Sequence, residues 1–158
     1  MLKYVNTRIV FLEIPREITL AIELSNCPNK CKGCHSPELQ QDIGTELTIE
    51  KLDNIISSYM PGITCVCFMG GDNDISLRLT FAKHIHSKYH NRVKVACYSG
   101  NDNLPEMSHL KSFDYYKYGH YDEKSGPLDS KTTNQKLLKY NKRTDSIEDI
   151  TYEFWNKI

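Results

Sequence analysis

Residues 18–35 read ITLAIELSNCPNKCKGCH, a stretch that joins a predicted strand to three cysteines. Within residues 19–24, leucine and isoleucine alternate with other residues, which is typical of a β-strand with one buried face. The segment after it contains proline, asparagine and glycine, so we expect a loop. The strand therefore leads into a loop that carries three thiols, Cys27, Cys31 and Cys34.

Downstream of this loop, predicted helices alternate with predicted strands. The elements that we expect, in chain order, are strands at 9–11 and 18–24, a helix at 47–60 capped by Thr48, a strand at 63–71, a helix at 76–89, a strand at 93–100, a short helix at 105–110, strands at 114–119 and 136–140, and a helix at 147–155. Such alternation favours a parallel sheet with crossover helices. A closed eightfold barrel needs roughly 250 residues. We therefore predict an α/β fold, an open partial (βα) barrel with flanking helices.

Three loops follow the predicted strands and carry polar residues or glycines. They are the cysteine loop, Gly70-Gly71-Asp72 and Ser99-Gly100-Asn101. Because ligands bind at the carboxyl ends of strands in parallel α/β folds, we expect these loops to share one rim. Taken singly, the second and third loops are also ordinary turns.

The composition is that of an ordinary globular protein. The chain has 158 residues, 39% hydrophobic and 25% charged, which predicts one domain over residues 1–158. A formal net charge of +0 gives no electrostatic footprint for nucleic acid or an anionic membrane. The sequence contains neither a long apolar run nor a signal peptide, so we expect a cytoplasmic protein without a disulfide framework.

The spacing of the loop cysteines suits an iron–sulfur cluster. Such clusters are usually held by four cysteine thiolates, and the fourth is missing nearby, which leaves one iron open to a small molecule with an amine and a carboxylate. A zinc site that adds His35 is an alternative, although adjacent ligands are awkward for a tetrahedral site. We interpret the remaining cysteines as small buried hydrophobic residues, although a second cluster is conceivable: Cys65, Cys67 and Cys97.

The pattern Cys27-x-x-x-Cys31-x-x-Cys34, placed before a βα repeat, resembles the signature of the radical S-adenosylmethionine superfamily. The resemblance implies a fold of that superfamily's type and a [4Fe-4S] cluster on these three cysteines. It also implies S-adenosyl-L-methionine as second cofactor, bound to the open iron and split into methionine and a 5′-deoxyadenosyl radical. The chemistry would then belong to the cofactors, and the protein would bind, orient and exclude solvent.

The same resemblance assigns roles to the neighbouring loops. The residues it places at the cofactors are Gly33, Cys34, His35, Gly70, Gly71, Asp72 and Ser99. Gly70-Gly71-Asp72 resembles the superfamily's Gly-Gly-Glu motif, which receives the methionine amine, but aspartate replaces glutamate here. Ser99 would contact the ribose or the methionine carboxylate.

A narrower resemblance covers about residues 4–141. The forms CPxxCxGCHSPE, Gly-Gly-Asp, YSGN and GPLDSKTTNQKLLKY are similar to those of activating proteins of anaerobic (class III) ribonucleoside-triphosphate reductase. This implies an enzyme that makes a glycyl radical on that reductase, with a flavodoxin-type reductant. Alternatives are the activator of another glycyl-radical enzyme, such as pyruvate formate-lyase, and a small-molecule enzyme of the 7-carboxy-7-deazaguanine synthase type. An alternative from a different functional class is a non-catalytic zinc or iron–sulfur binding module.

Overall fold

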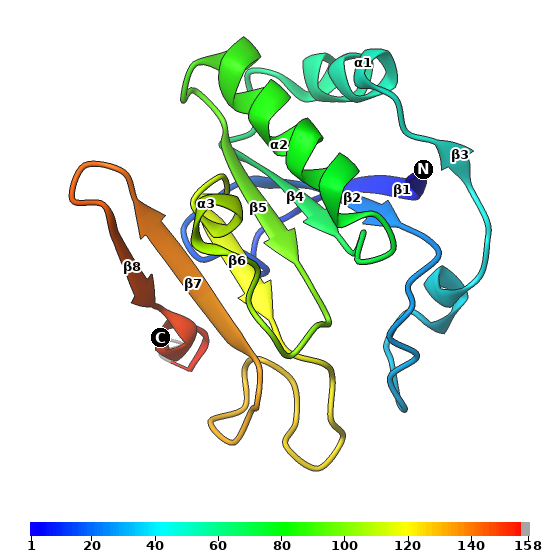
Figure 1. Ribbon diagram of the computed structural model, residues 1–158, viewed down its shortest axis with the longest axis vertical. Helices are drawn as coiled ribbons and strands as arrows, with labels where there is room; N and C mark the ends of the chain where they lie inside the picture. Colours follow the sequence, from blue (N-terminus) through cyan, green and yellow to red (C-terminus); the bar gives the residue numbers. More distant parts are fainter. Residues whose placement is uncertain (156–158) are drawn as a thin grey trace.

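A computed structural model describes residues 1–155 and shows one curved eight-stranded sheet (Figure 1). The strands follow the order β3-β1-β2-β4-β5-β6-β7-β8 across the sheet. Their bounds are β1 Lys3–Val10, β2 Thr19–Leu24, β3 Thr45–Glu46, β4 Cys65–Met69, β5 Lys94–Tyr98, β6 Tyr115–Tyr118, β7 Lys136–Asn141 and β8 Ser146–Asp149.

The sheet is mixed. Its central strands β2, β4, β5 and β6 run parallel, with Leu20 opposite Val66 and Val66 opposite Val95. On the flanks, β1 and β3 on one side and β7 and β8 on the other are antiparallel to their neighbours. The sheet does not close on itself, because β3 and β8 form separate edges. The antiparallel flanks are an addition to the predicted architecture, and the open partial barrel of the radical S-adenosylmethionine type stays a prediction.

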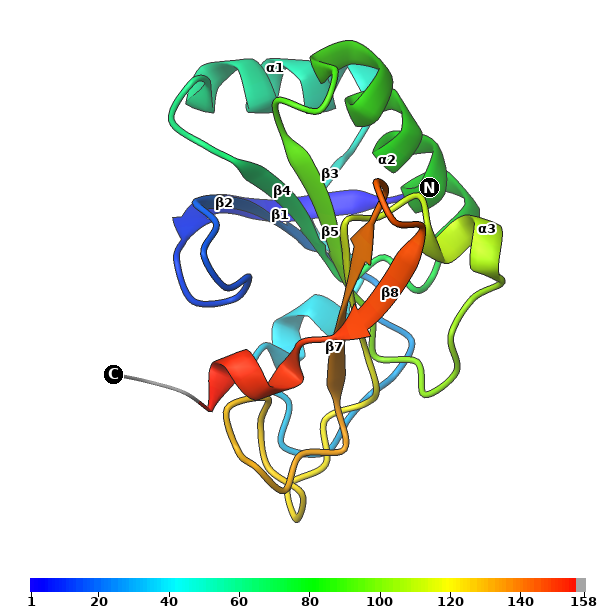
Figure 2. The same cartoon turned by 90° about the vertical axis from the view of Figure 1, so that its left-hand side faces the viewer.

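Helices connect the parallel strands and pack on one face of the sheet (Figures 1 and 2). They are α1 Ile49–Tyr59, α2 Ile75–Tyr89 and the short α3 Met107–Leu110, with 3₁₀ turns η1 Pro37–Gln40 and η2 Thr151–Phe154. The predicted cap of α1 is confirmed, because the Thr48 hydroxyl accepts a hydrogen bond from the Lys51 amide. None of the helices in residues 1–155 is long and apolar enough to span a membrane.

The two faces of the sheet have separate cores. On the helical face, sheet residues such as Ile22 and Phe68 pack against Ile56 and Phe81 of the helices. The opposite face carries a smaller cluster, in which Cys65 and Cys67 pack with others from the β1–β2 loop and the C-terminal segment. The second face is therefore covered by loops rather than by helices, which leaves room for a site.

The C-terminal helix predicted at 147–155 is wrong. Residues 146–149 form β8, a hairpin partner of β7 in which Ile147 pairs with Tyr140, and only the 3₁₀ turn Thr151–Phe154 follows. Asp145 has a φ of 49°, which lets the chain reverse between the two strands. The pairing with β7 is a tertiary interaction that local periodicity does not reveal.

Candidate functional site

The ends of three parallel strands line a cavity on the loop-covered face of the sheet. Met69, Tyr98 and Lys117, near the carboxyl ends of β4, β5 and β6, form its floor, and Cys34 and His35 of the cysteine loop form part of its wall. Its volume is about 660 Å³. We call it the sheet cavity. Its position at the carboxyl ends of the strands is where parallel α/β folds bind ligands.

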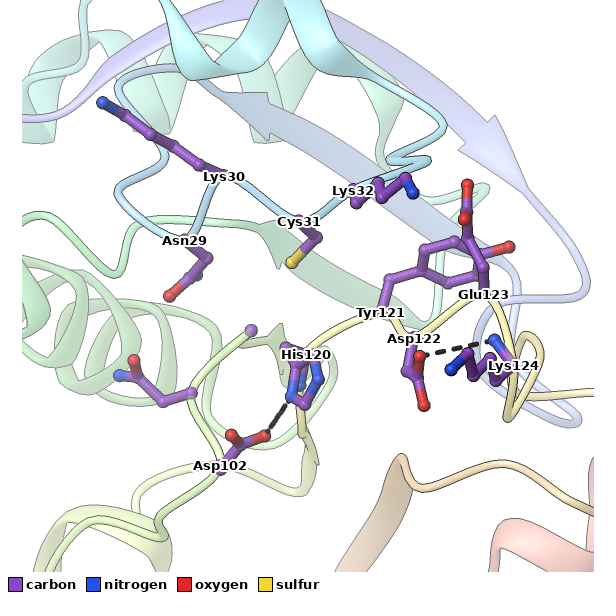
Figure 3. Close-up of a pocket in the computed structure, with 12 residues that line it drawn as sticks. Asn29, Lys30, Cys31, Lys32, Asp102, His120, Tyr121, Asp122, Glu123 and Lys124 are labelled. Carbon is purple, nitrogen blue, oxygen red and sulfur yellow. Dashed lines mark hydrogen bonds and ion pairs between the residues drawn. The ribbon is translucent and has the colours of Figure 1, made fainter.

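A second cavity, the loop cavity, lies on the other side of the cysteine loop (Figure 3). It has a volume of about 590 Å³ and lies between residues 29–32, residues 100–102 and residues 120–124. Cys31 lines it. Tyr121 lines both cavities and packs on His35, with 5.2 Å between the ring centroids.

The three loop cysteines are half-buried but face different surroundings. Cys34 lines the sheet cavity and Cys31 the loop cavity, while the Cys27 sulfur accepts a hydrogen bond of 3.6 Å from Asn29 Nδ2. Within residues 1–155, no three His, Cys, Asp or Glu side chains are grouped closely enough to hold a metal ion. The structure thus places the predicted ligands on one loop without gathering them at one point.

The donor set nevertheless fits an iron–sulfur cluster. Cysteine thiolates are its usual ligands, and all three lie on one short loop that is partly open to solvent. The loop is held at its start by the Cys27 amide, which donates to the Leu39 carbonyl, and a turn joins Cys34 to Cys31. Because metal sites often complete their geometry only on binding, convergence of these thiols would accompany loading.

The other three cysteines belong to the core, as the sequence interpretation predicts. Cys65, Cys67 and Cys97 are fully buried. Burial raises the pKa of Cys97 to about 12 and the pKa values of Cys65 and Cys67 well above the ordinary value. A buried, protonated thiol is a poor metal ligand and a poor nucleophile.

Gly70 and Gly71 form the turn after β4, with φ values of 108° and 94°. Only glycine adopts these conformations readily. At Gly71 a Cβ atom would also lie 3.0 Å from Leu24 and 3.1 Å from the Arg78 side chain. The backbone of this turn therefore requires glycine at both positions. The turn places the next residue, Asp72, at the ends of the strands.

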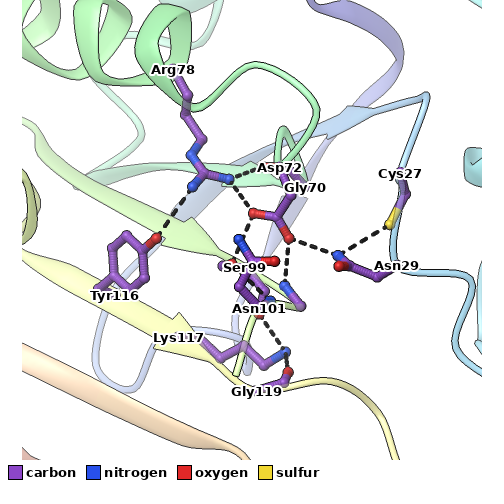
Figure 4. Close-up of polar contacts among 11 residues, drawn as sticks. Cys27, Asn29, Gly70, Asp72, Arg78, Ser99, Asn101, Tyr116, Lys117 and Gly119 are labelled. Carbon is purple, nitrogen blue, oxygen red and sulfur yellow. Dashed lines mark hydrogen bonds and ion pairs between the residues drawn. The ribbon is translucent and has the colours of Figure 1, made fainter. Parts of the chain in front are cut away.

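The Asp72 carboxylate is fully engaged by the protein (Figure 4). Its Oδ1 atom accepts from Arg78 Nη1 at 2.9 Å and from the Ser99 hydroxyl at 2.8 Å, and its Oδ2 atom accepts from Asn29 Nδ2 at 2.7 Å and from the Gly100 amide at 2.8 Å. Burial opposes ionisation, but the Arg78 charge and these hydrogen bonds outweigh it and lower the Asp72 pKa. Asp72 is predicted to receive an amine of the cofactor. Such an amine would have to compete with four protein donors for the Asp72 carboxylate.

Arg78 is the cation of this buried pair. Its side chain has no exposed surface, and it also donates to the Gly70 carbonyl at 2.8 Å and to the Tyr116 hydroxyl at 3.2 Å. Its Nε atom has no hydrogen-bond partner in the described structure. Because unpaired buried charges are costly, this arginine and Asp72 depend on each other.

Lys117 is a buried cation in the floor of the sheet cavity. Its ammonium donates to the carbonyls of Ser99 at 3.0 Å and Gly119 at 2.9 Å, and it lies 5.7 Å from the centre of the Tyr98 ring. Burial lowers the pKa of Lys117 to about 8. Without an anionic partner in its hydrogen bonds, this ammonium is suited to an anionic ligand group.

The predicted cofactor residues of the cysteine loop lie under the segment that follows β6. Gly33 has a φ of 76°, and a Cβ atom there would collide with the Glu123 side chain at 2.2 Å. The structure therefore places Cys34 and His35 in the wall of the sheet cavity and Gly33 against the Glu123 side chain, whereas Ser99 is buried and donates its hydroxyl to Asp72. The roles of these residues toward a cofactor stay predictions.

Sequence reasoning missed Asn29, Arg78 and Lys117. Arg78 shares a buried helical face with Phe81 and Ile85, so a lone arginine within an apolar stripe was the available signal. Lys117 follows the same alternation as Tyr115 in a buried strand, which also marks it. For Asn29 no signal in the sequence separates it from an ordinary loop residue.

The model of one protein family, the 4Fe-4S single cluster domain, matches residues 18–143. The match extends from β2 through the cysteine loop to the β7–β8 turn, and the chain belongs to this family. The predicted [4Fe-4S] cofactor is therefore confirmed at the level of the family. Comparisons with curated proteins and with solved structures gave no match.

Proposed function

We propose that this protein is a radical S-adenosylmethionine enzyme that activates anaerobic ribonucleoside-triphosphate reductase by forming a glycyl radical on it. The observation that carries the proposal is the set of three loop thiols. Cys65, Cys67 and Cys97 are enclosed in the core, so none of them is available as a fourth ligand. A cluster bound by three protein thiolates keeps one iron for a substrate or cofactor.

The cluster, when bound by Cys27, Cys31 and Cys34, would supply the electron that cleaves S-adenosylmethionine. The protein's part is to hold the cofactor. In the sheet cavity the Lys117 ammonium offers a cation for the methionine carboxylate, and Met69 and Tyr98 offer an apolar floor. The cavity volume of about 660 Å³ is ample for such a ligand. These features support the proposal independently of the cysteine spacing.

A large external substrate suits the architecture. Phe11 and Leu12 stand exposed at the rim of the sheet cavity. Exposed apolar groups at a cavity rim are typical of interaction sites. The choice of the reductase as substrate, and of a flavodoxin-type reductant, rests on the resemblance in residues 4–141.

The test of the chemistry is release of 5′-deoxyadenosine from S-adenosylmethionine by the anaerobically reconstituted, dithionite-reduced protein. We expect release by the wild type and loss of at least about 100-fold in Cys31→Ala, because a first-sphere ligand is removed. Cys65→Ala, which removes a core thiol, is the matched control and should retain release. Zinc in place of iron and sulfide, or unchanged release by Cys31→Ala, would refute the proposal.

The test of the substrate is a glycyl-radical EPR signal on the partner protein. Mixed with the anaerobic reductase and S-adenosylmethionine, the reduced protein should generate the signal there, and pyruvate formate-lyase should stay silent under the same conditions. A signal on pyruvate formate-lyase alone would assign the protein to that enzyme instead. 5′-Deoxyadenosine without a radical on either partner would point to a small-molecule substrate.

A further inference from the structure

Asn29 occupies a position in the cysteine loop that no family motif explains. Its side-chain nitrogen contacts two acceptors, the Cys27 sulfur at 3.6 Å and the Asp72 Oδ2 atom at 2.7 Å (Figure 4). An amide NH₂ group has two hydrogens, so both contacts can be made at once. One side chain thus joins a cluster-ligand thiol to the buried core of the sheet.

The acceptor on the core side, the Asp72 carboxylate, is also hydrogen-bonded by other residues. Asp72 receives further hydrogen bonds from Arg78, Ser99 and the Gly100 amide, and its side chain is only 2% exposed. Arg78 is in turn held by the Gly70 carbonyl. Because both oxygens of Asp72 accept hydrogen bonds from these neighbours, the orientation of its carboxylate is constrained. The carboxylate in turn orients the Asn29 amide.

From this chain of contacts we propose that Asn29 is a positioning residue for the cluster, and that the Asp72–Arg78 pair orients it. The Asn29 amide donates a hydrogen bond to the Cys27 thiolate and anchors the cysteine loop to the ends of β4 and β5. The inference rests on the 4Fe-4S family and goes beyond the proposed radical chemistry, since any cluster on this loop would experience the same donor.

Two consequences follow from general chemistry. Hydrogen bonds to cluster sulfurs are among the factors that set reduction potential, and a donor favours the more negatively charged, reduced state. The Asn29 donor therefore raises the potential of the cluster. The bond to Asp72 also orders the cysteine loop before any metal binds, because it ties residue 29 to a rigid part of the sheet.

The first experiment measures the midpoint potential of the reconstituted cluster by EPR-monitored titration without S-adenosylmethionine. Asn29→Leu keeps the side-chain size and removes the donor, so we expect a more negative potential, with about tenfold less reduced cluster at a fixed potential. Asn29→Gln, which keeps an amide, should recover part of the shift. Asn54→Leu is the matched control, because it makes the same change at an exposed position of α1, away from both cavities, and should leave the potential unchanged.

The second experiment uses the cluster-free protein and reads hydrogen exchange in residues 25–36. Asn29→Leu and Asp72→Asn should both exchange faster than the wild type in this segment, and the double variant no faster than the quicker single variant, because both act through one contact. If Asp72→Asn does not fold, Ser99→Ala, which removes one of the bonds that orient the carboxylate, takes its place.

Specific outcomes would overturn the inference. A wild-type potential in Asn29→Leu, or an equal shift in Asn54→Leu, would refute the role of Asn29 as hydrogen-bond donor to the cluster ligand. Unchanged hydrogen exchange would refute its role as anchor of the cysteine loop. The proposed function fails separately. A shifted potential without 5′-deoxyadenosine release would refute the radical chemistry alone, and release with an unshifted potential would refute the role of Asn29 alone.

Discussion

Lys117 brings a positive charge into the floor of the sheet cavity at a cost to the fold. Its side chain is buried, and its ammonium donates hydrogen bonds to two carbonyls, those of Ser99 and Gly119. A protein gains little stability from such a group, whereas a cavity that must hold a carboxylate gains selectivity from it. The burial of this ammonium therefore supports the proposal that the sheet cavity binds a carboxylate.

The lowered pKa of Lys117 gives a prediction about stability. Between its folded pKa of about 8 and its ordinary value of 10.5, the unfolded chain binds more protons than the folded chain. Stability from this group therefore rises with pH across that window and is lowest below it. We expect the unfolding free energy of the wild type, relative to Lys117→Met, to increase by about 2 kcal/mol from pH 7 to pH 9.5.

Urea denaturation of the cluster-free protein at both pH values checks this prediction. Lys124→Met is the control, because Lys124 is exposed and its side chain has no ion pair in the described structure. Its stability difference from the wild type should not change with pH over the window. A flat difference for Lys117→Met would mean that the Lys117 ammonium does not lose its proton in the folded protein below pH 9.5.

At the scale of elements, the C-terminal segment forms part of the wall of the sheet cavity. The 3₁₀ turn Thr151–Phe154 places Phe154 in the wall of the sheet cavity, and the Trp155 indole donates to the Leu128 carbonyl at 3.0 Å. Arg16 of the β1–β2 loop lies 3.6 Å from Glu153. The segment therefore links the β1–β2 loop to the loop that precedes β7.

Removal of the indole donor should loosen this wall. In Trp155→Phe we expect faster hydrogen exchange at residues 127–129 and a severalfold weaker binding of S-adenosylmethionine, since Leu128 lines the cavity. Tyr152→Phe, on the same turn but at an exposed position, is the control and should bind normally. Isothermal titration under anaerobic conditions measures the affinity. Unchanged affinity together with faster exchange would show that this wall does not contact the cofactor.

The elements that the sequence predicts well are those with a strong local signal. Thr48 caps α1 and the apolar stripe of α2 packs on the sheet, so both helices begin and end close to the predicted residues. The edge strands β3 and β8 could not be predicted in this way, because their pairing depends on β1 and β7 at the far ends of the sheet. Local periodicity carries no information about such partners.

At the scale of the whole molecule, the sequence predicts where the candidate site lies better than it predicts the hydrogen bonds within it. Topology brings the cysteine loop, Gly70-Gly71-Asp72 and Ser99 to one rim, and their hydrogen bonds connect all three. The sequence did not reveal that Asp72 would be saturated by Arg78 and backbone donors, because that depends on a helix residue six positions later turning back onto the strand ends. The family resemblance suggested that the Asp72 carboxylate would be available to bind an amine.

The Arg78–Asp72 pair should therefore control the stability of the entire fold. It connects α2, the β4 turn, the loop after β5 and Tyr116 of β6. Loss of one partner from a buried pair costs about 3–5 kcal/mol, a large part of the total stability of a domain. We expect Arg78→Met to lose about this much in urea unfolding at pH 7, and the exposed control Arg143→Met to stay within about 0.5 kcal/mol of the wild type.

The pH dependence of that loss separates the ion pair from simple packing. The Asp72 pKa is lowered in the folded protein, so the stability it contributes is fully present above its ordinary value of 3.8 and is lost as the pH falls below it. The deficit of Arg78→Met should thus be largest at neutral pH and shrink as the pH falls below 4, where the wild type also loses its carboxylate. A deficit that stayed constant would mean that Arg78 stabilises the fold by filling space, because packing has no proton to lose.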